Sequence, residues 1–341
     1  MPTSDDPTAS ERKKDHIDLA FKSQILAERL DLRFYYEPLF AGHPNPDRAY
    51  GRVPFAGKVL NAPVWVSSMT GGTQMARTIN HHLARACNEF RMGMGLGSCR
   101  GLLFSDDTLS DFDVRGLIGD DLPLFANLGI AQLEELIRRN ELYRVNHLLD
   151  KLRADGLIIH VNPMQEWMQP EGDVFEFPPL QTIERVLESG DIPVIVKEVG
   201  QGMGYESLKT LLQMPLVAID FGASGGTNFS MLELLRSNQE QQDAYGPLTL
   251  IGHSALEMTQ MCNQLVADLG AAVRCQQLII SGGVRGFLDG YYLTEISKLP
   301  AVYGQASGFL KYAQKDYETL RQHIQRQMEG LKLAKAYLRV R

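Results

Sequence analysis

Short apolar runs alternate with amphipathic segments from about residue 63 onward. The run 157–159 (Leu-Ile-Ile) is typical, and such near-continuous apolar runs suit parallel strands covered on both faces. Between the runs, segments such as 131–139, 180–189 and 207–213 carry apolar residues at helical spacing. Strands that alternate with helices indicate parallel βα units.

Nine segments have the character of strands. They are 64–69, 92–96, 124–127, 157–161, 194–198, 217–220, 248–251, 278–281 and 301–303. We exclude 248–251, because His253 and Ser254 precede Ala-Leu-Glu-Met, which is typical of a helix start. A (β/α)8 barrel needs roughly 250 residues, and the remaining eight strands span a stretch of that length. The sequence therefore predicts the α/β class and a TIM barrel.

The flanks of the chain do not follow this rhythm. Residues 1–62 are predicted to be an N-terminal extension and lead-in segment, followed by the barrel at 63–312 and a C-terminal helix at 313–341. The stretch 33–60 is irregular and rich in Pro and Gly. We expect it to cover the bottom or flank of the barrel.

Composition narrows the functional class. The net charge of -7 argues against non-specific nucleic-acid binding. The four cysteines show neither CxxC pairing nor metal-ligand spacing, which favours reduced thiols. The N-terminus has no apolar signal-like region, and no later stretch is apolar enough to span a bilayer. We therefore expect a cytoplasmic protein that does not contact membranes.

Polar residues concentrate directly after the strand at 157–161. The stretch 160–173 begins with His160 and contains Asn162, Gln165 and Glu166. His, Asn and Gln can hydrogen-bond an anionic or amide-like ligand, and a glutamate can hold a hard cation. The carboxyl ends of the strands are where a barrel enzyme places its chemistry. An ordinary polar loop is the alternative interpretation.

The other predicted strands also end in polar or glycine-rich turns. Their sequences include Ser67–Gly72, Gly97–Arg100, Asn127–Gly129, Lys197–Gly202, Asp220–Thr227, Ser281–Arg285 and Gly304–Ser307. Glycines let backbone N–H groups approach a flat ring or a phosphate. The last two turns fit the phosphate site that is common in such barrels.

Lys197 lies at the polar end of an apolar strand. A cation there needs an anionic or electron-rich partner. One interpretation is an ion pair with a carboxylate such as Asp220. The other, which we favour, is contact with the electron-rich N1/O2 edge of a flavin.

Nine motifs together resemble one family, the type 2 isopentenyl-diphosphate isomerases, from Arg12 to about Phe309. The motifs are Arg-Lys-Lys-Asp-His-Ile, Phe-Ala-Gly-Lys-Val-Leu-Asn-Ala-Pro, Ser-Met-Thr-Gly-Gly, Gly-Ser-Cys-Arg, His-Val-Asn-Pro-Met-Gln-Glu, Gln-Pro-Glu-Gly-Asp, Val-Lys-Glu-Val-Gly-Gln-Gly, Gly-Gly-Thr-Asn-Phe and Ser-Gly-Gly-Val-Arg. The resemblance implies interconversion of isopentenyl diphosphate and dimethylallyl diphosphate in isoprenoid biosynthesis. It also implies a barrel that binds FMN, with NADPH as a reductant that primes the flavin, and a homo-oligomer (tetramer or octamer).

The resemblance assigns roles to residues by motif. The FMN contacts would be Ser68, Met69, Thr70, Ser98, Asn127, Lys197, Thr227, Gly282, Gly283, Val284, Arg285, Ala306 and Ser307. The substrate, mainly its diphosphate, would meet Arg12, Lys13, Ser98, Cys99, Arg100, His160, Asn162 and Gln165. Glu166 would bind Mg2+ on the diphosphate. The cations at Arg12 and Lys13 would fold over the barrel mouth, and Cys99 stands where the family has glutamine.

Moving a double bond requires that a proton be added at one carbon and that a proton be removed from another carbon. An isolated alkene is very weakly basic, and Gln165 cannot protonate it. The resemblance implies that N5 of reduced FMN is the acid and that Gln165 orients the substrate over the ring. It makes Gln165, His160 and Asn162 the catalytic residues.

Two other functions remain open. An FMN oxidoreductase of the 2-hydroxy-acid-oxidase kind would use a His/Arg pair, which His160 and Arg100 could imitate. A non-catalytic phosphate-binding barrel would need neither Lys197 nor the polar stretch 160–173.

Overall fold

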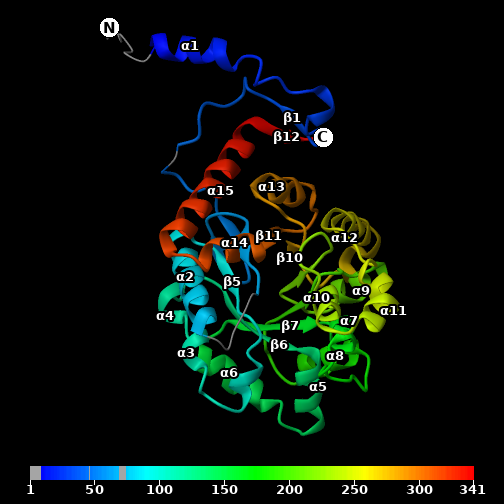
Figure 1. Ribbon diagram of the computed structural model, residues 1–341. Coiled ribbons are helices and arrows are strands. Elements are labelled where there is room, and N and C mark those ends of the chain that lie inside the picture. Colours follow the sequence, from blue (N-terminus) through cyan, green and yellow to red (C-terminus); the bar gives the residue numbers. More distant parts are fainter. Residues whose placement is uncertain (1–8, 46, 69–73) are drawn as a thin grey trace.

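The computed structural model describes residues 9–45, 47–68 and 74–341. Its centre is a closed barrel of eight parallel strands in the order β10-β11-β4-β5-β6-β7-β8-β9 (Figure 1). The strands are β4 (Val64–Val66), β5 (Gly93–Gly95), β6 (Leu124–Gly129), β7 (Gly156–Val161), β8 (Val194–Glu198), β9 (Ala218–Asp220), β10 (Leu278–Ser281) and β11 (Ala301–Gln305). The predicted TIM barrel is confirmed.

The predicted strands match the observed ones, with differences at their ends. β8 and β10 have the predicted bounds, whereas β6 and β11 each run two residues further. β4 ends at Val66, and the end of its predicted range lies outside the described residues. The segment 248–251 lies at the end of a helix and in the turn after it, so its exclusion as a strand is confirmed.

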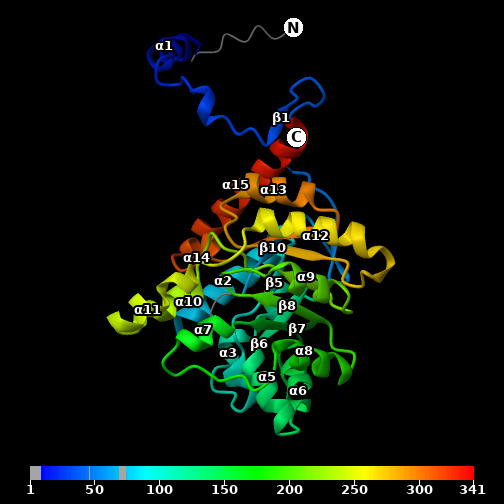
Figure 2. The ribbon, with the colours of Figure 1, turned by 90° about the vertical axis from the view of Figure 1, so that its right-hand side faces the viewer.

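Helices surround the barrel on its outer side (Figures 1 and 2). They are α2 (Gln74–Phe90), α3 (Leu109–Phe112), α4 (Arg115–Ile118), α5 (Ile130–Arg138), α6 (Tyr143–Leu152), α7 (Pro163–Met168), α8 (Pro179–Glu188), α9 (Tyr205–Leu212), α10 (Phe229–Arg236), α11 (Gln239–Thr249), α12 (Ala255–Leu269), α13 (Phe287–Ile296), α14 (Ser307–Ala313) and α15 (Tyr317–Tyr337), with short 3-10 turns at Arg100–Leu103 and Gly270–Ala272. Within the described ranges, no helix is both long and apolar enough to cross a membrane.

A β-hairpin closes the bottom of the barrel, where the strands begin. It consists of β2 (Val53–Phe55) and β3 (Lys58–Leu60). The ring centroid of Phe55 lies 5.6 Å from that of the buried Trp65, and the Ala56 N–H donates to Gln277 just before β10. The prediction that 33–60 supplies a covering layer is confirmed for this hairpin.

A buried ion network strengthens the same end of the barrel. Asp155 accepts hydrogen bonds from Lys58 at 2.5 Å and from Arg115 at 2.8 Å. The Arg115 side chain is only 2% exposed. Burial opposes ionisation of Asp155, but hydrogen bonds from Lys58, Leu124 and Arg115 outweigh it and hold its pKa below the usual value.

The N-terminal arm lies apart from the barrel. It contains α1 (Ala9–Leu19) and a 3-10 turn at Ala27–Arg29, and every residue from 11 to 32 is exposed. The chain returns to the body at β1 (Phe34–Tyr36), which pairs antiparallel with β12 (Leu338–Val340) after the long C-terminal helix. In Figures 1 and 2, α1 lies beyond this small sheet, at the end of the molecule remote from the barrel.

Candidate active site

Three ionisable side chains form a row across adjacent strands at the barrel mouth. His160 of β7 is the register partner of Lys197 in β8, which is in turn the partner of Asp220 in β9. Partners in a parallel sheet project to the same face, so the three groups belong to one surface of the barrel. These three residues, which are far apart in the sequence, thus lie side by side at the ends of their strands, where the sequence predicted polar groups.

A cavity of about 320 Å³ opens next to this row, within the usual size range of ligand pockets. The predicted flavin residues that line it are Ser68, Lys197, Thr227, Gly282, Gly283, Val284, Ala306 and Ser307. Asn127, Ser98 and Arg285 are not among its lining residues. Met69 and Thr70 lie outside the described residues.

The inner wall of the cavity holds polar atoms that lack a partner. Within the described part of the chain, no hydrogen bond is made by Ser67 Oγ, Ser68 Oγ or Gln305 Oε1, although all three are buried. An unsatisfied buried polar group costs about 1–3 kcal/mol. These atoms therefore fit a polar ligand such as a flavin ring, with its carbonyl and N–H groups. Ser67 and Gln305 were absent from the predicted set, although both occupy strand ends.

Two glycines shape the turn after β10. Gly282 has φ +88° and Gly283 has φ +69°, a backbone region that favours glycine. A Cβ on Gly282 would lie 2.0 Å from the carbonyl oxygen of Ala223. The turn consequently brings bare backbone to the cavity, as a phosphate-binding turn requires.

Lys197 is buried, and its Nζ donates to the backbone carbonyl of Glu198 at 2.5 Å. Among the described residues it has no ion pair with Asp220, the alternative partner considered from sequence. Lys197 thus keeps donor capacity for a ligand in the cavity.

Asp220 instead belongs to a buried network beneath the cavity. It accepts a hydrogen bond from Ser281 Oγ, which in turn accepts from the Gly222 N–H at 2.9 Å. Burial raises the pKa of Asp220, while the charge of Lys197 and the Ser281 contact oppose the rise. This network fixes the ends of β9 and β10 against each other.

Glu198, another residue that the predicted set omitted, orders the turn after β8. Its Oε2 accepts from the N–H groups of Gly200, Gln201 and Gly202, each at 2.7 Å. Burial nevertheless raises its pKa. Only the structure shows that this carboxylate faces its own turn rather than the ligand.

His160 is held by Asn127. His160 Nδ1 lies 2.7 Å from Asn127 Oδ1, and Asn127 Nδ2 donates to the Leu96 carbonyl. Since the amide oxygen can only accept, the proton of a neutral His160 belongs on Nδ1. Asn127 is therefore placed to orient His160.

Glu166 already participates in two hydrogen bonds. Its Oε1 accepts from Asn162 Nδ2 at 2.9 Å, and its Oε2 accepts from the Asp173 N–H at 2.8 Å. Asn162 Nδ2 also donates to Gln165 Oε1 at 3.2 Å. The described residues contain no group of three or more His, Cys, Asp or Glu side chains that could hold a metal. A cation at Glu166 would therefore need ligands from the substrate and from water.

Arg100 and Cys99 differ in orientation. Arg100 is exposed and pairs with Asp173 at 3.0 Å, and Asp173 also accepts from Gln132. Cys99 is fully buried, with its Sγ facing the Gly97 carbonyl, while Ser98 is exposed. The Cys99 side chain therefore lies in the core rather than in the mouth. All four cysteines are free and buried.

The structure does not place Arg12 and Lys13 over the mouth. Both lie on the exposed helix α1, away from the barrel (Figure 2). In this conformation the arm is attached to the body through Arg33 and β1, and the expected closure is not seen. The sequence motif carries no information about the direction of the arm.

Solved structures share the fold of this chain. The flavin-binding domain of baker's yeast flavocytochrome b2 superposes with a TM-score of 0.61 at 11% identity, covering 89% of this chain and 72% of that chain. A mandelate oxidase variant with a monooxide FMN adduct gives a TM-score of 0.54 at 12% identity, covering 91% of this chain and 88% of that chain. At sequence identities of 11% and 12%, these similarities show a shared fold and nothing further.

Several curated proteins are far more similar to this chain in sequence than those solved structures are. No protein-family model matches the chain. An isopentenyl-diphosphate delta-isomerase of Rickettsia africae (strain ESF-5) is 35% identical over 329 residues, or 95% of this chain and 92% of the relative. The protein of that name from Rickettsia typhi (strain Wilmington) is 33% identical over 328 residues, with the same coverage. This similarity extends over nearly the whole of both chains and agrees with the motifs at the barrel mouth, so the chain belongs to the isopentenyl-diphosphate delta-isomerase family.

Proposed function

We propose that this enzyme interconverts isopentenyl diphosphate and dimethylallyl diphosphate with reduced FMN in the barrel cavity and Mg2+ on the diphosphate. The observation that carries the proposal is the cavity wall. There, Ser67, Ser68 and Gln305 present unsatisfied polar atoms beside the buried Lys197. A polar, planar ligand would satisfy these groups, and the glycine turn after β10 would receive its phosphate.

The chain's own residues would hold the cofactor. Lys197 would stabilise the anionic edge of the reduced ring, and Ser68, Thr227, Ala306 and Ser307 line the rest of the cavity. When bound in its reduced state, FMN supplies a proton donor at N5 for the weakly basic alkene. NADPH or another reductant would be required only to prime it.

Substrate would bind on the side of the mouth formed by the turns after β5 and β7. Arg100 would exchange its exposed ion pair with Asp173 for the diphosphate, since exposed ion pairs contribute only about 0–1 kcal/mol. His160 and Asn162 border the same region, and Gln165 would orient the hydrocarbon part. None of these three is an acid able to protonate an alkene, so their role is positioning.

Glu166 would hold Mg2+ together with the substrate diphosphate. The ion usually keeps several waters and binds through one or two carboxylates together with substrate phosphates. Glu166 supplies one such carboxylate at this position of the mouth. The metal would offset the diphosphate charge and would not act as a proton source.

The N-terminal arm would move when substrate binds. Arg12 and Lys13 lie on a wholly exposed segment attached through Arg33 and β1. About twenty residues separate Lys13 from Arg33, and an extended chain of that length spans roughly 65 Å. The proposal is that the arm swings from this root to a barrel mouth, where its cations would meet the diphosphate. We also propose a homo-oligomer, since the arm exposes large apolar side chains such as Phe21 and Ile25.

The decisive experiment separates isomerisation from net redox chemistry. The purified protein should show a flavin absorption spectrum and should be inactive with isopentenyl diphosphate while oxidised. Anaerobic dithionite or NADPH should start turnover without stoichiometric consumption of the reductant. In D2O, the dimethylallyl product should carry deuterium in the methyl group formed by protonation. Reductant use in proportion to product, or full activity with oxidised flavin, would indicate an oxidoreductase instead.

A further inference from the structure

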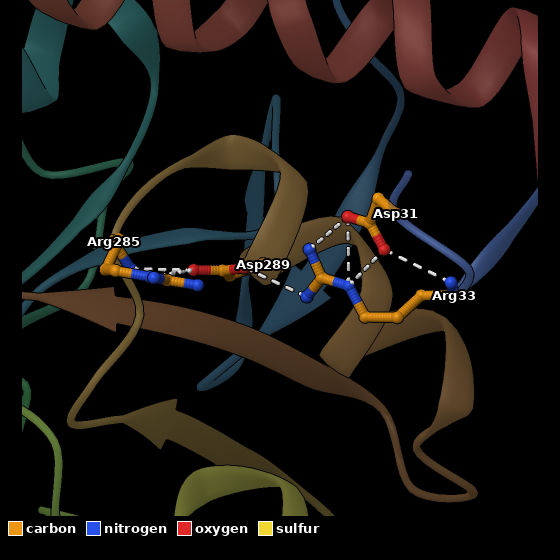
Figure 3. Close-up of polar contacts among 4 residues, drawn as sticks. All are labelled: Asp31, Arg33, Arg285 and Asp289. Atoms are coloured by element: carbon orange, nitrogen blue, oxygen red, sulfur yellow. Dashed lines mark hydrogen bonds and ion pairs between the residues drawn. The ribbon is translucent and has the colours of Figure 1, made fainter. Parts of the chain in front are cut away.

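One carboxylate joins the glycine turn of the cavity to the root of the N-terminal arm. Asp289 lies in the first turn of α13 and is only 14% exposed. Its Oδ2 accepts from both the N–H and the Nε of Arg285, each at 3.2 Å, while its Oδ1 accepts from Arg33 Nη1 at 2.9 Å. Figure 3 shows Asp289 between the two arginines.

The Arg285 side of this contact belongs to the cavity turn. Arg285 directly follows Gly282, Gly283 and Val284, which line the cavity. Its backbone N–H is already used by Asp289, so that group is not available to a ligand. Its side chain is 86% exposed and is anchored through Nε. Asp289 thus fixes the end of the turn from outside the cavity.

The Arg33 side of the contact belongs to the arm. Arg33 donates three side-chain hydrogen bonds of 2.6 to 3.1 Å to Asp31 (Figure 3). Its guanidinium also lies 5.1 Å from the ring centroid of Tyr292 in α13. The Arg33 carbonyl also accepts from the Arg341 N–H. This is where the exposed arm becomes part of the body.

The two arginines favour the ionised form of Asp289. Burial opposes ionisation of Asp289, but the hydrogen bonds from Arg33 and Arg285 outweigh it and lower its pKa. Loss of Arg33 would leave Asp289 with Arg285 alone and would loosen the turn that it holds.

We propose that Asp289 is a positioning residue that fixes the phosphate side of the cofactor cavity and couples it, through Arg33, to the root of the N-terminal arm. The inference rests on the proposed function, in which the turn receives the FMN phosphate and the arm carries substrate-binding cations. Coupling of binding equilibria is reciprocal. Occupation of the turn by phosphate should therefore stabilise the arm root, and loss of the arm contact should weaken phosphate binding.

The test compares FMN with riboflavin, which has the same ring but no phosphate. Flavin fluorescence is titrated with the full-length apoprotein. Asp289→Asn should raise the Kd for FMN about tenfold, equivalent to roughly 1.4 kcal/mol, and Arg33→Gln should raise it several-fold. Both variants should bind riboflavin within twofold of the unsubstituted protein. Arg321→Gln, which removes an ion pair with Glu89 elsewhere on the surface, is the matched control and should change neither Kd.

Hydrogen exchange reports the reciprocal effect without any measurement of activity. FMN should slow amide exchange at residues 31–36 in the unsubstituted protein, whereas riboflavin should not. Asp289→Asn should abolish this protection. Should Asp289→Asn fail to fold, Arg33→Gln carries the same test, because it leaves both Arg285 contacts in place.

The outcomes separate the two proposals. Normal FMN binding by Asp289→Asn and Arg33→Gln, or tighter binding through a released Arg285, would overturn this inference and leave the proposed cofactor standing. Equal losses for FMN and riboflavin would also overturn it, because they would indicate general damage to the cavity. If the unsubstituted protein binds neither flavin, the proposed cofactor and this inference both fail.

Discussion

His160 Nδ1 and Asn127 Oδ1 lie 2.7 Å apart, a hydrogen bond between neighbouring barrel strands. Burial, followed by the charge of Lys197, lowers the pKa of His160 to about 3. His160 is therefore neutral at physiological pH in the ligand-free protein, with its proton on Nδ1. Its Nε2 can then accept a hydrogen bond, and it becomes a donor only if a diphosphate draws a second proton onto the ring.

The first prediction concerns this ionisation. An NMR titration of the ligand-free protein should show no protonation of His160 between pH 5 and 8, a range chosen to bracket the ordinary histidine pKa. Because the folded pKa lies below the unfolded value of 6.5, the contribution of His160 to stability is complete above about pH 6.5. That contribution declines as the pH falls from there towards 3.

Lys197→Met should raise the pKa of His160, because it removes the nearby positive charge. A His160 resonance that titrates near 6.5 in the unsubstituted protein would contradict the assignment. An unchanged His160 pKa in Lys197→Met would show that burial alone causes the shift.

The second prediction concerns Lys197 and the flavin. Lys197→Ala should weaken FMN binding or make the reduced anion harder to form, since one charge-assisted contact contributes about 1.5–3 kcal/mol. Equilibrium binding and the reduction potential of the bound flavin measure the two effects. If both are unchanged in the variant, Lys197 does not contact the flavin.

The third prediction concerns the metal. Glu166→Gln should keep the fold and FMN but lose most activity, and high Mg2+ should restore part of it. Glu171→Gln is the matched control, because Glu171 lies in the same segment but pairs with Arg236 on the surface. Normal activity of Glu166→Gln at low Mg2+ would show that Glu166 is not a ligand.

The fourth prediction concerns Gln165. Gln165→Ala should reduce kcat by about 100-fold while FMN binding is retained, because small misplacements of substrate have effects of that size. Single-turnover measurements with reduced enzyme report the chemical step directly. A change in KM alone would mean that Gln165 contributes uniform binding rather than orientation.

The fifth prediction concerns stability at the bottom of the barrel. Asp155→Asn should lower the free energy of unfolding by about 3 kcal/mol, because it leaves the buried Arg115 without its carboxylate. Asp106→Asn, which removes an exposed partner of Lys151, should change it by less than about 1 kcal/mol. Similar losses in the two variants, measured by urea denaturation, would contradict this ranking.

The same carboxylate has a defined pH dependence. The folded pKa of Asp155 is lowered, so its contribution is present above the unfolded value of 3.8 and is lost as the pH falls through the folded pKa. Asp155→Asn should consequently lose less stability than the unsubstituted protein on acidification in that range.

The amino-acid pattern alone determined the barrel and most of the cavity wall. Apolar runs such as 194–198 and 278–281 became strands with the predicted bounds, because parallel strands buried on both faces need continuous apolar sequence. Residues that follow such strands must meet at one end of a closed barrel. For that reason the strand-end turns of the sequence place Lys197, Thr227 and Gly282 in one cavity, and all three line it.

Tertiary structure alone decided the directions of side chains and of the arm. Cys99 and Ser98 are neighbours, yet one is buried and the other exposed, because a turn can aim adjacent side chains oppositely. Sequence spacing gave no sign that Asp289 contacts Arg33, since these residues are 256 positions apart. The α1 cations lie away from the mouth because the arm leaves the body at Arg33 and is exposed from residue 11 to residue 32, and local sequence does not encode the path of an exposed segment.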